Sequence, residues 1–177
     1  MAKSNGIFFR LCKYIDSHVL KLLYFTLILP YIMYGIEVWG STFGYIMNRV
    51  LVCQKRAVRS IFKLPYDAHT SVFFKVINSL RVGDLHKYQL ALSVFKTLYM
   101  GQNRNFAISL TRGISNHDHN TRRNLNFILP RYRRSRSQHS ILYQAIKFWN
   151  KLPQDLYTNK SLSVFRQKLR TFLLTSY

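Results

Sequence analysis

Residues 22–40 read LLYFTLILPYIMYGIEVWG, and this stretch decides how the chain folds. Glu37 is its only acidic or basic residue, although the whole chain carries a formal net charge of +21. An apolar stretch in so basic a chain is either a membrane span or a buried helix in a protein that binds polyanions.

The length of the stretch favours the buried helix. Residues 22–36 lie between Lys21 and Glu37 and would form a helix of roughly 22 Å, whereas a hydrocarbon core is about 30 Å thick. Pro30 lies in the middle and is expected to kink the helix, which a packed bundle accommodates more readily than a short membrane span. We therefore expect a core helix, and keep a membrane anchor at residues 22–36 as the less favoured alternative.

Composition points to one folded domain with a polyanionic partner. The 177 residues are 48% hydrophobic, which is enough to build a core, and 27 Lys and Arg face 6 acidic residues. Nucleic acid is the expected partner, with an anionic membrane surface second. Cys12 and Cys53 fall in apolar helical patterns and are expected to be small buried residues without a disulfide or metal.

Residues 46–63 give the clearest amphipathic helix. At about 100° per residue the apolar side chains and Gln54 fall on one arc. The opposite arc holds Arg49, Lys55, Arg56, Arg59 and Lys63. No acidic residue lies between Arg49 and Lys63, so no i, i+4 partner balances these charges. A solvated cationic face is the simpler interpretation, but the unopposed charge favours contact with phosphates.

Helical periodicity also covers residues 7–15, 72–80 and 85–99, and Gly101 is a stop signal. Residues 1–101 are therefore predicted to form a small antiparallel helical bundle. Residues 102–140 follow as a basic loop region, and residues 141–177 as an extension ending in an amphipathic helix. Residues 127–129 and 141–143 could pair as a short β-hairpin. Overall, the predicted fold is mainly α with a partly irregular C-terminal region.

The loop region is rich in arginine. Residues 104–136 hold eight arginines, no lysine and one acid. Arginine binds phosphate oxygens in pairs and stacks on bases, and Tyr132 adds a ring to the cluster, so this segment is expected to grip a single strand. A nuclear-localisation signal is the alternative interpretation. The candidate contacts are Arg122, Arg123, Arg131, Arg133, Arg134 and Arg136.

Signatures of catalysis are missing from the sequence. Polymerase and nuclease metal sites need converging carboxylates, yet no two of the six acids lie closer than 17 residues. The run His117-Asp118-His119 is interpreted as a hydrophilic loop. We expect no chemistry, no cofactor and no bound metal from this chain alone.

A set of short motifs nevertheless resembles one family in sequence order. They are Ala2–Ile7, Leu23-Tyr24, Pro30-Tyr31, Tyr34-Gly35, Val38-Trp39-Gly40, Gln54–Arg59, Ala68-His69-Thr70, Phe74-Lys75, Asp84–Leu92, Asn120-Thr121-Arg122, Phe148–Pro153 and Ser163–Leu169. Together they resemble the region after the polymerase palm in non-LTR (LINE-type, jockey-like) retrotransposon reverse transcriptases. The match spans residues 2–172, with Asn5 where that family usually has an aliphatic residue.

The resemblance implies a thumb and C-terminal extension that lie against template-primer. The palm with its catalytic aspartates and Mg²⁺ would belong to a longer parent polymerase, and this chain would be a non-catalytic fragment of it. It also places Gln54, Lys55, Arg56 and Arg59 on the helix nearest nucleic acid. An independent small basic RNA-binding protein remains the alternative. If expressed, either protein would be found in the nucleus or in a cytoplasmic ribonucleoprotein.

Overall fold

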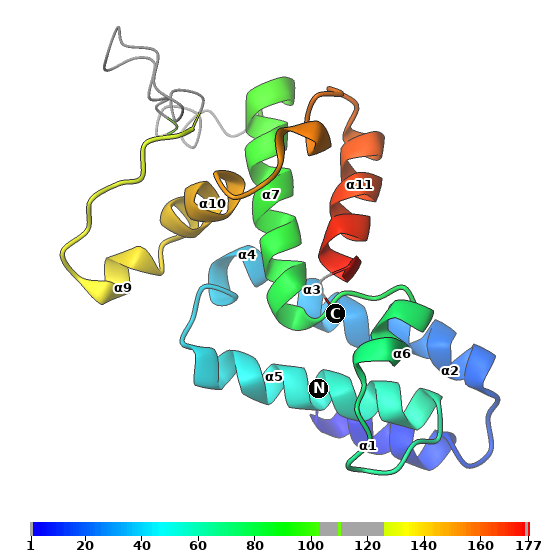
Figure 1. Ribbon diagram of the computed structural model, residues 1–177. Coiled ribbons are helices and arrows are strands. Elements are labelled where there is room, and N and C mark those ends of the chain that lie inside the picture. The colour runs from blue at the N-terminus through cyan, green and yellow to red at the C-terminus, as the bar shows by residue number, and fades with distance from the viewer. Residues whose placement is uncertain (1, 103–109, 111–125, 176) are drawn as a thin grey trace, which may run out of the picture. The chain divides into compact units, whose positions relative to one another are not determined.

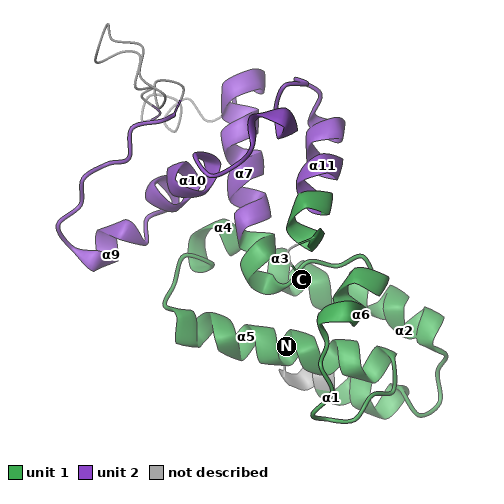
Figure 2. Ribbon diagram, in the orientation of Figure 1, with its two compact units in different colours: residues 1–86, 171–177 green, residues 87–170 purple. Residues whose placement is uncertain are grey.

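The computed structural model describes residues 2–102, 110, 126–175 and 177 (Figure 1). This part of the chain forms helices, turns and loops without an extended strand, which confirms the mainly α prediction. It gathers into two compact units (Figure 2): residues 1–86 with 171–177 form unit 1, and residues 87–170 form unit 2. The domain boundaries predicted at residues 101 and 140 are drawn from changes in composition, whereas these two units are defined by compactness. The predicted boundaries therefore stay a prediction.

Unit 1 holds the first helices of the chain. They are α1 (Ala2–Leu11), α2 (Ser17–Leu23), η1 (Tyr24–Ile28), α3 (Leu29–Met33), α4 (Ile36–Trp39), α5 (Gly44–Ile61), α6 (Ser71–Val76) and the start of α7 (Val82–Met100). Both α1 and α2 pack against α5, which is the longest helix lying wholly within the described part of this unit. The core of unit 1 therefore forms around the apolar face of α5.

The helical stretch before Pro30 contains a π-helical turn, while the predicted kink stays a prediction. The Leu29 N–H donates to the carbonyl of Tyr24, five residues back, in η1. Proline has no N–H to donate and its ring crowds the carbonyl of Thr26, four residues earlier, so a wider turn before it accommodates the ring. Gly35 then ends α3 with φ +60, a conformation that glycine adopts at little cost.

Only one side of the apolar stretch is buried. Leu20, Tyr24, Ile28, Ile32 and Ile36 recur every four residues and are at most 1% exposed. A strict four-residue repeat drifts around a regular α-helix, and the wider π turn reduces this drift by turning the chain less per residue. The opposite side is open to solvent at Leu22, Leu27, Tyr31, Tyr34 and Val38. The expected core helix therefore packs one face into the core and leaves its opposite face exposed to solvent.

The side-chain amide of Gln54 makes several hydrogen bonds within the core of unit 1. The Gln54 Nε2 donates to the Tyr24 hydroxyl and to the Leu80 carbonyl, each at 2.9 Å, and its Oε1 accepts from the Val82 N–H at 2.9 Å. The Tyr24 hydroxyl lies 3.0 Å from Ser79 Oγ. Val82 begins α7, and first-turn N–H groups have no partner within their own helix. Gln54 therefore ties α5 to the start of α7.

Unit 2 is built on an aromatic core. Its elements are the rest of α7, α9 (Ser135–Gln138), α10 (Ile141–Trp149), η3 (Gln154–Leu156) and most of α11 (Leu162–Thr175). The rings of Phe95 and Phe165 stack at 4.3 Å, and Trp149 stacks on Tyr157 at 5.1 Å. Gly101, with φ +65, follows the last residue of α7, as its stop signal predicts. The amphipathic helix predicted at the end of the C-terminal extension is confirmed as α11.

The predicted β-hairpin is wrong. Residues 141–143 form the first turn of α10, where Ser140 Oγ accepts from the Tyr143 N–H as an N-cap. The backbone of Phe127 pairs instead with a side chain. Its N–H donates to Asn150 Oδ1 at 3.0 Å, and its carbonyl accepts from Asn150 Nδ2 at 2.8 Å. These two bonds join the Phe127 backbone to the end of α10.

None of the helices in the described ranges is both long enough and apolar enough to cross a membrane.

Candidate nucleic-acid interface

The helix α5 is as amphipathic as its sequence predicts. Its core face holds Ala57, Val58 and Ile61, each at most 1% exposed. On the other face Arg49 and Arg56 are exposed, while Lys55 and Arg59 are half-buried. The helix is fixed by its apolar face, and its cations are displayed along the outside.

Lys63 lies in the turn that ends α5. It has φ +52, its N–H donates to the Ser60 carbonyl, and the next N–H, of Leu64, donates to the Arg59 carbonyl at 2.9 Å. These two bonds form a Schellman motif with lysine in the left-handed position that glycine usually occupies. Lys63 is exposed, so the turn projects its ammonium group beyond the helix end.

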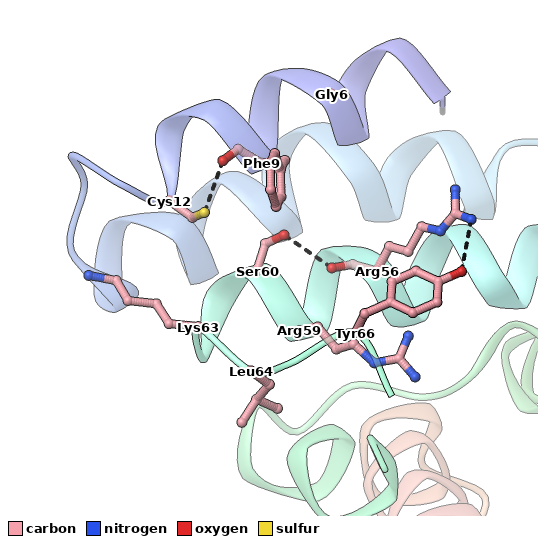
Figure 3. Close-up of a pocket in the computed structure, with 9 residues that line it drawn as sticks. All are labelled: Gly6, Phe9, Cys12, Arg56, Arg59, Ser60, Lys63, Leu64 and Tyr66. Atoms are coloured by element: carbon pink, nitrogen blue, oxygen red, sulfur yellow. Dashed lines mark hydrogen bonds between the residues drawn. The ribbon is translucent and has the colours of Figure 1, made fainter. Parts of the chain in front are cut away.

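Three of the five predicted cations line one pocket of about 600 Å³ (Figure 3). One wall comes from α1 and the other from the last turns of α5 and the segment that follows. The lining residues are Gly6, Phe9, Cys12, Arg56, Arg59, Ser60, Lys63, Leu64 and Tyr66. Arg49 and Lys55 are not among them. The fold thus separates the predicted group into pocket cations and cations elsewhere on α5.

Tyr66 stands between two arginines at this pocket. An Arg56 terminal nitrogen donates to the Tyr66 hydroxyl at 3.4 Å, and Arg59 Nε donates to the Ala68 carbonyl at 3.0 Å. The two guanidinium carbons lie 5.8 and 5.7 Å from the centre of the Tyr66 ring. The bond from Arg56 lowers the pKa of the Tyr66 phenol and raises that of Arg56. The ring and the cations are held as a unit.

The second predicted group belongs to unit 2. Arg131, Arg133, Arg134 and Arg136 are all exposed, and Arg136 lies in the short helix α9. Tyr132 between them is half-buried, with its ring centre 5.8 Å from that of Tyr143. The arginines are therefore available to phosphates, whereas the ring expected to stack on bases already packs against a neighbour.

Two predicted contacts, Arg122 and Arg123, lie outside the described residues, as does the run His117-Asp118-His119. Among the residues that are described, no three His, Cys, Asp or Glu side chains gather into a group that could hold a metal ion. Cys12 and Cys53 are half-buried rather than fully buried as predicted, and Cys12 lines the pocket.

The structure buries one polar residue of the predicted helix and adds other candidates. Gln54 is completely buried in the hydrogen bonds described above, in agreement with its place on the apolar arc, so it lies on this helix without facing the cationic side. Tyr66 and Phe9 were missed as candidates. The order Lys63-Leu64-Pro65-Tyr66, a helix end followed by a turn, was a usable signal for Tyr66, because such a turn folds back on the last helical turn. Phe9 gave no signal, because it resembles any apolar helix residue.

Comparisons of the chain with protein-family models, with curated proteins and with solved structures found no match.

Proposed function

We propose that this chain is the non-catalytic thumb and C-terminal region of a non-LTR retrotransposon reverse transcriptase, and that it binds RNA or an RNA–DNA duplex through its basic surfaces. The family assignment rests on the ordered motifs from residue 2 to residue 172. The binding role rests on the structure of α5 together with the charge of the chain. The catalytic aspartates and their Mg²⁺ belong to the parent polymerase outside this chain.

One observation carries the binding proposal. A helix whose apolar face is fixed in the core presents Arg49, Lys55, Arg56 and Arg59 without an acidic residue between them. Nearby opposite charges normally balance a cationic face that serves only solubility. A net charge of +21 adds long-range attraction for any polyanion and accelerates its encounter with the protein. Binding to the phosphates of a nucleic acid would account for both the unbalanced cations on α5 and the high net charge.

The experiment measures affinity against salt for the full chain with a labelled RNA and a labelled RNA–DNA duplex. The logarithm of the affinity should fall linearly with the logarithm of the salt concentration, because bound phosphates release counterions. Replacing Arg49, Lys55, Arg56 and Arg59 together with glutamine should flatten this slope by about 0.7 to 0.9 for each lost contact.

A matched variant controls for net charge. Lys13, Lys75, Lys151 and Lys160 are exposed and lie outside both candidate groups, so their fourfold glutamine variant removes the same charge from other places. Its slope should change by less than half as much. Equal slopes for the two variants would show that binding follows net charge alone, and would defeat the assignment to α5.

The family part of the proposal has its own test. Translation of the DNA upstream of Met1 in all frames should uncover a palm with paired aspartates. Intact non-coding sequence there would instead favour the independent small basic RNA-binding protein, which would use the same surface.

A further inference from the structure

We infer that the pocket between α1 and the end of α5 holds one unpaired nucleotide of a nucleic-acid single strand, with its base against Tyr66 and Phe9 and its phosphates at Arg56, Arg59 and Lys63. This inference rests on the proposed function and gives it a specific site and substrate class.

The size of the pocket suits a single nucleotide. Its volume of about 600 Å³ falls within the range of roughly 300 to 1,000 Å³ that is usual for small-molecule sites. Its walls come from two helices that pack against each other, so the pocket is part of the folded unit. An unpaired nucleotide is small enough to enter the pocket. A base in an intact duplex stays paired and stacked, so it cannot enter.

The charges of the pocket suit phosphate. Arg56, Arg59 and Lys63 line it, and none of its lining residues is acidic. The hydrogen bonds of Arg56 and Arg59 to Tyr66 and Ala68 each use one N–H of a guanidinium, which has five donors. These bonds hold the groups in place and leave donors for phosphate oxygens, which guanidinium groups bind in pairs.

The aromatic rings of the pocket suit a base. Tyr66 is 72% exposed and Phe9 is 64% exposed, so a base can reach both rings. The guanidinium carbons lie 5.7 to 5.8 Å from the Tyr66 ring centre, beyond the separation of about 4 Å at which stacked atoms touch. Figure 3 shows Phe9 reaching down from α1 towards α5, on the side of the pocket away from Tyr66. Stacking on exposed rings between cations is how proteins hold unpaired bases.

Cations outside the pocket favour a strand over a free nucleotide. Arg49 lies seven residues before Arg56 on the same helix, or roughly 10 Å along its axis, and is exposed. It can meet a phosphate of the same strand beyond the pocket. A free nucleotide would gain nothing from it.

The test compares a 12-nucleotide single-stranded RNA that carries one 2-aminopurine with a blunt 12-base-pair duplex. Replacing Tyr66 with leucine should weaken single-strand binding about 10-fold and abolish the change in 2-aminopurine fluorescence, because one stacked base is lost. Duplex affinity and the salt slope should not change. Tyr66→Phe, which keeps the ring, should retain single-strand affinity within about twofold.

Tyr31→Leu is the matched control. Tyr31 is 66% exposed in α3 and does not line the pocket, so its loss should leave single-strand affinity within about twofold of the wild type. Equal effects of Tyr66→Leu and Tyr31→Leu would overturn the inference while the proposed function stands. A wild-type chain that binds neither nucleic acid would overturn both. Displacement of the RNA by micromolar adenosine monophosphate would overturn the assignment to a strand.

Discussion

Gln54 is a buried polar residue that connects separate segments of the core of unit 1. Its amide makes three hydrogen bonds, each 2.9 Å long, and its side chain is fully buried. They join α5 to two other segments, because Tyr24 lies in η1 while Leu80 and Val82 lie together at the start of α7. A buried amide is favourable only where its donors and acceptors are matched in this way.

Replacing Gln54 with leucine should lower the free energy of unfolding by about 3 kcal/mol. The Val82 N–H and the Leu80 carbonyl would stay buried without their partner, and each such group costs about 1 to 3 kcal/mol. Urea unfolding followed by circular dichroism measures the change. Asn48→Leu removes an exposed amide from the same helix and should change the free energy by less than about 0.5 kcal/mol. A similar loss in both variants would contradict this account.

The end of α5 is under backbone strain. Lys63 adopts φ +52 in the Schellman motif, where an L-residue with a Cβ costs roughly 1 to 2 kcal/mol more than glycine. Asn78, with φ +54, closes α6 through the same pair of bonds, and asparagine tolerates this conformation better than lysine. Lysine at residue 63 therefore costs stability, and the proposed role in phosphate binding would explain its presence.

Lys63→Gly should raise the free energy of unfolding by about 1 kcal/mol and weaken nucleic-acid binding. The first effect follows from the relief of strain, and the second from the loss of a pocket cation. Urea unfolding and a salt titration of RNA binding measure the two effects. Lys55→Gly in the interior of the same helix should instead destabilise by about 1 kcal/mol. A destabilised Lys63→Gly variant would rule out the strain.

Across the whole molecule, buried tyrosine phenols make the stability of the fold depend on alkaline pH. Burial raises the pKa values of Tyr24, Tyr88 and Tyr177, because the charged phenolate loses its hydration. Below about pH 10 each phenol is protonated in the folded and the unfolded chain, so the contribution to stability is fully present. Above pH 10 the unfolded chain loses these protons first. Stability therefore falls as the pH rises from 10 towards the folded-state pKa values.

Wild-type stability should decline above pH 10 more steeply than that of Tyr24→Phe. One phenol contributes at most about 1.4 kcal/mol per pH unit, and the variant has one fewer buried phenol. Urea unfolding between pH 8 and pH 11 measures the slope, which separates this effect from the lost hydrogen bonds of Tyr24. Lysine deprotonation affects both proteins alike. Parallel pH profiles would contradict the argument.

The sequence alone determined the features that depend on local patterns. Apolar periodicity predicted the two faces of α5 and the final helix α11, and Gly101 predicted the end of α7, since each follows from residues within one or two turns. Tertiary structure decided what local patterns cannot encode. It gave the buried Gln54 its partners in distant segments, paired the Phe127 backbone with the Asn150 side chain, and brought Phe9 to the pocket with Tyr66, 57 positions later in the chain. Those outcomes depend on which distant surfaces meet, and only packing of the whole chain selects them.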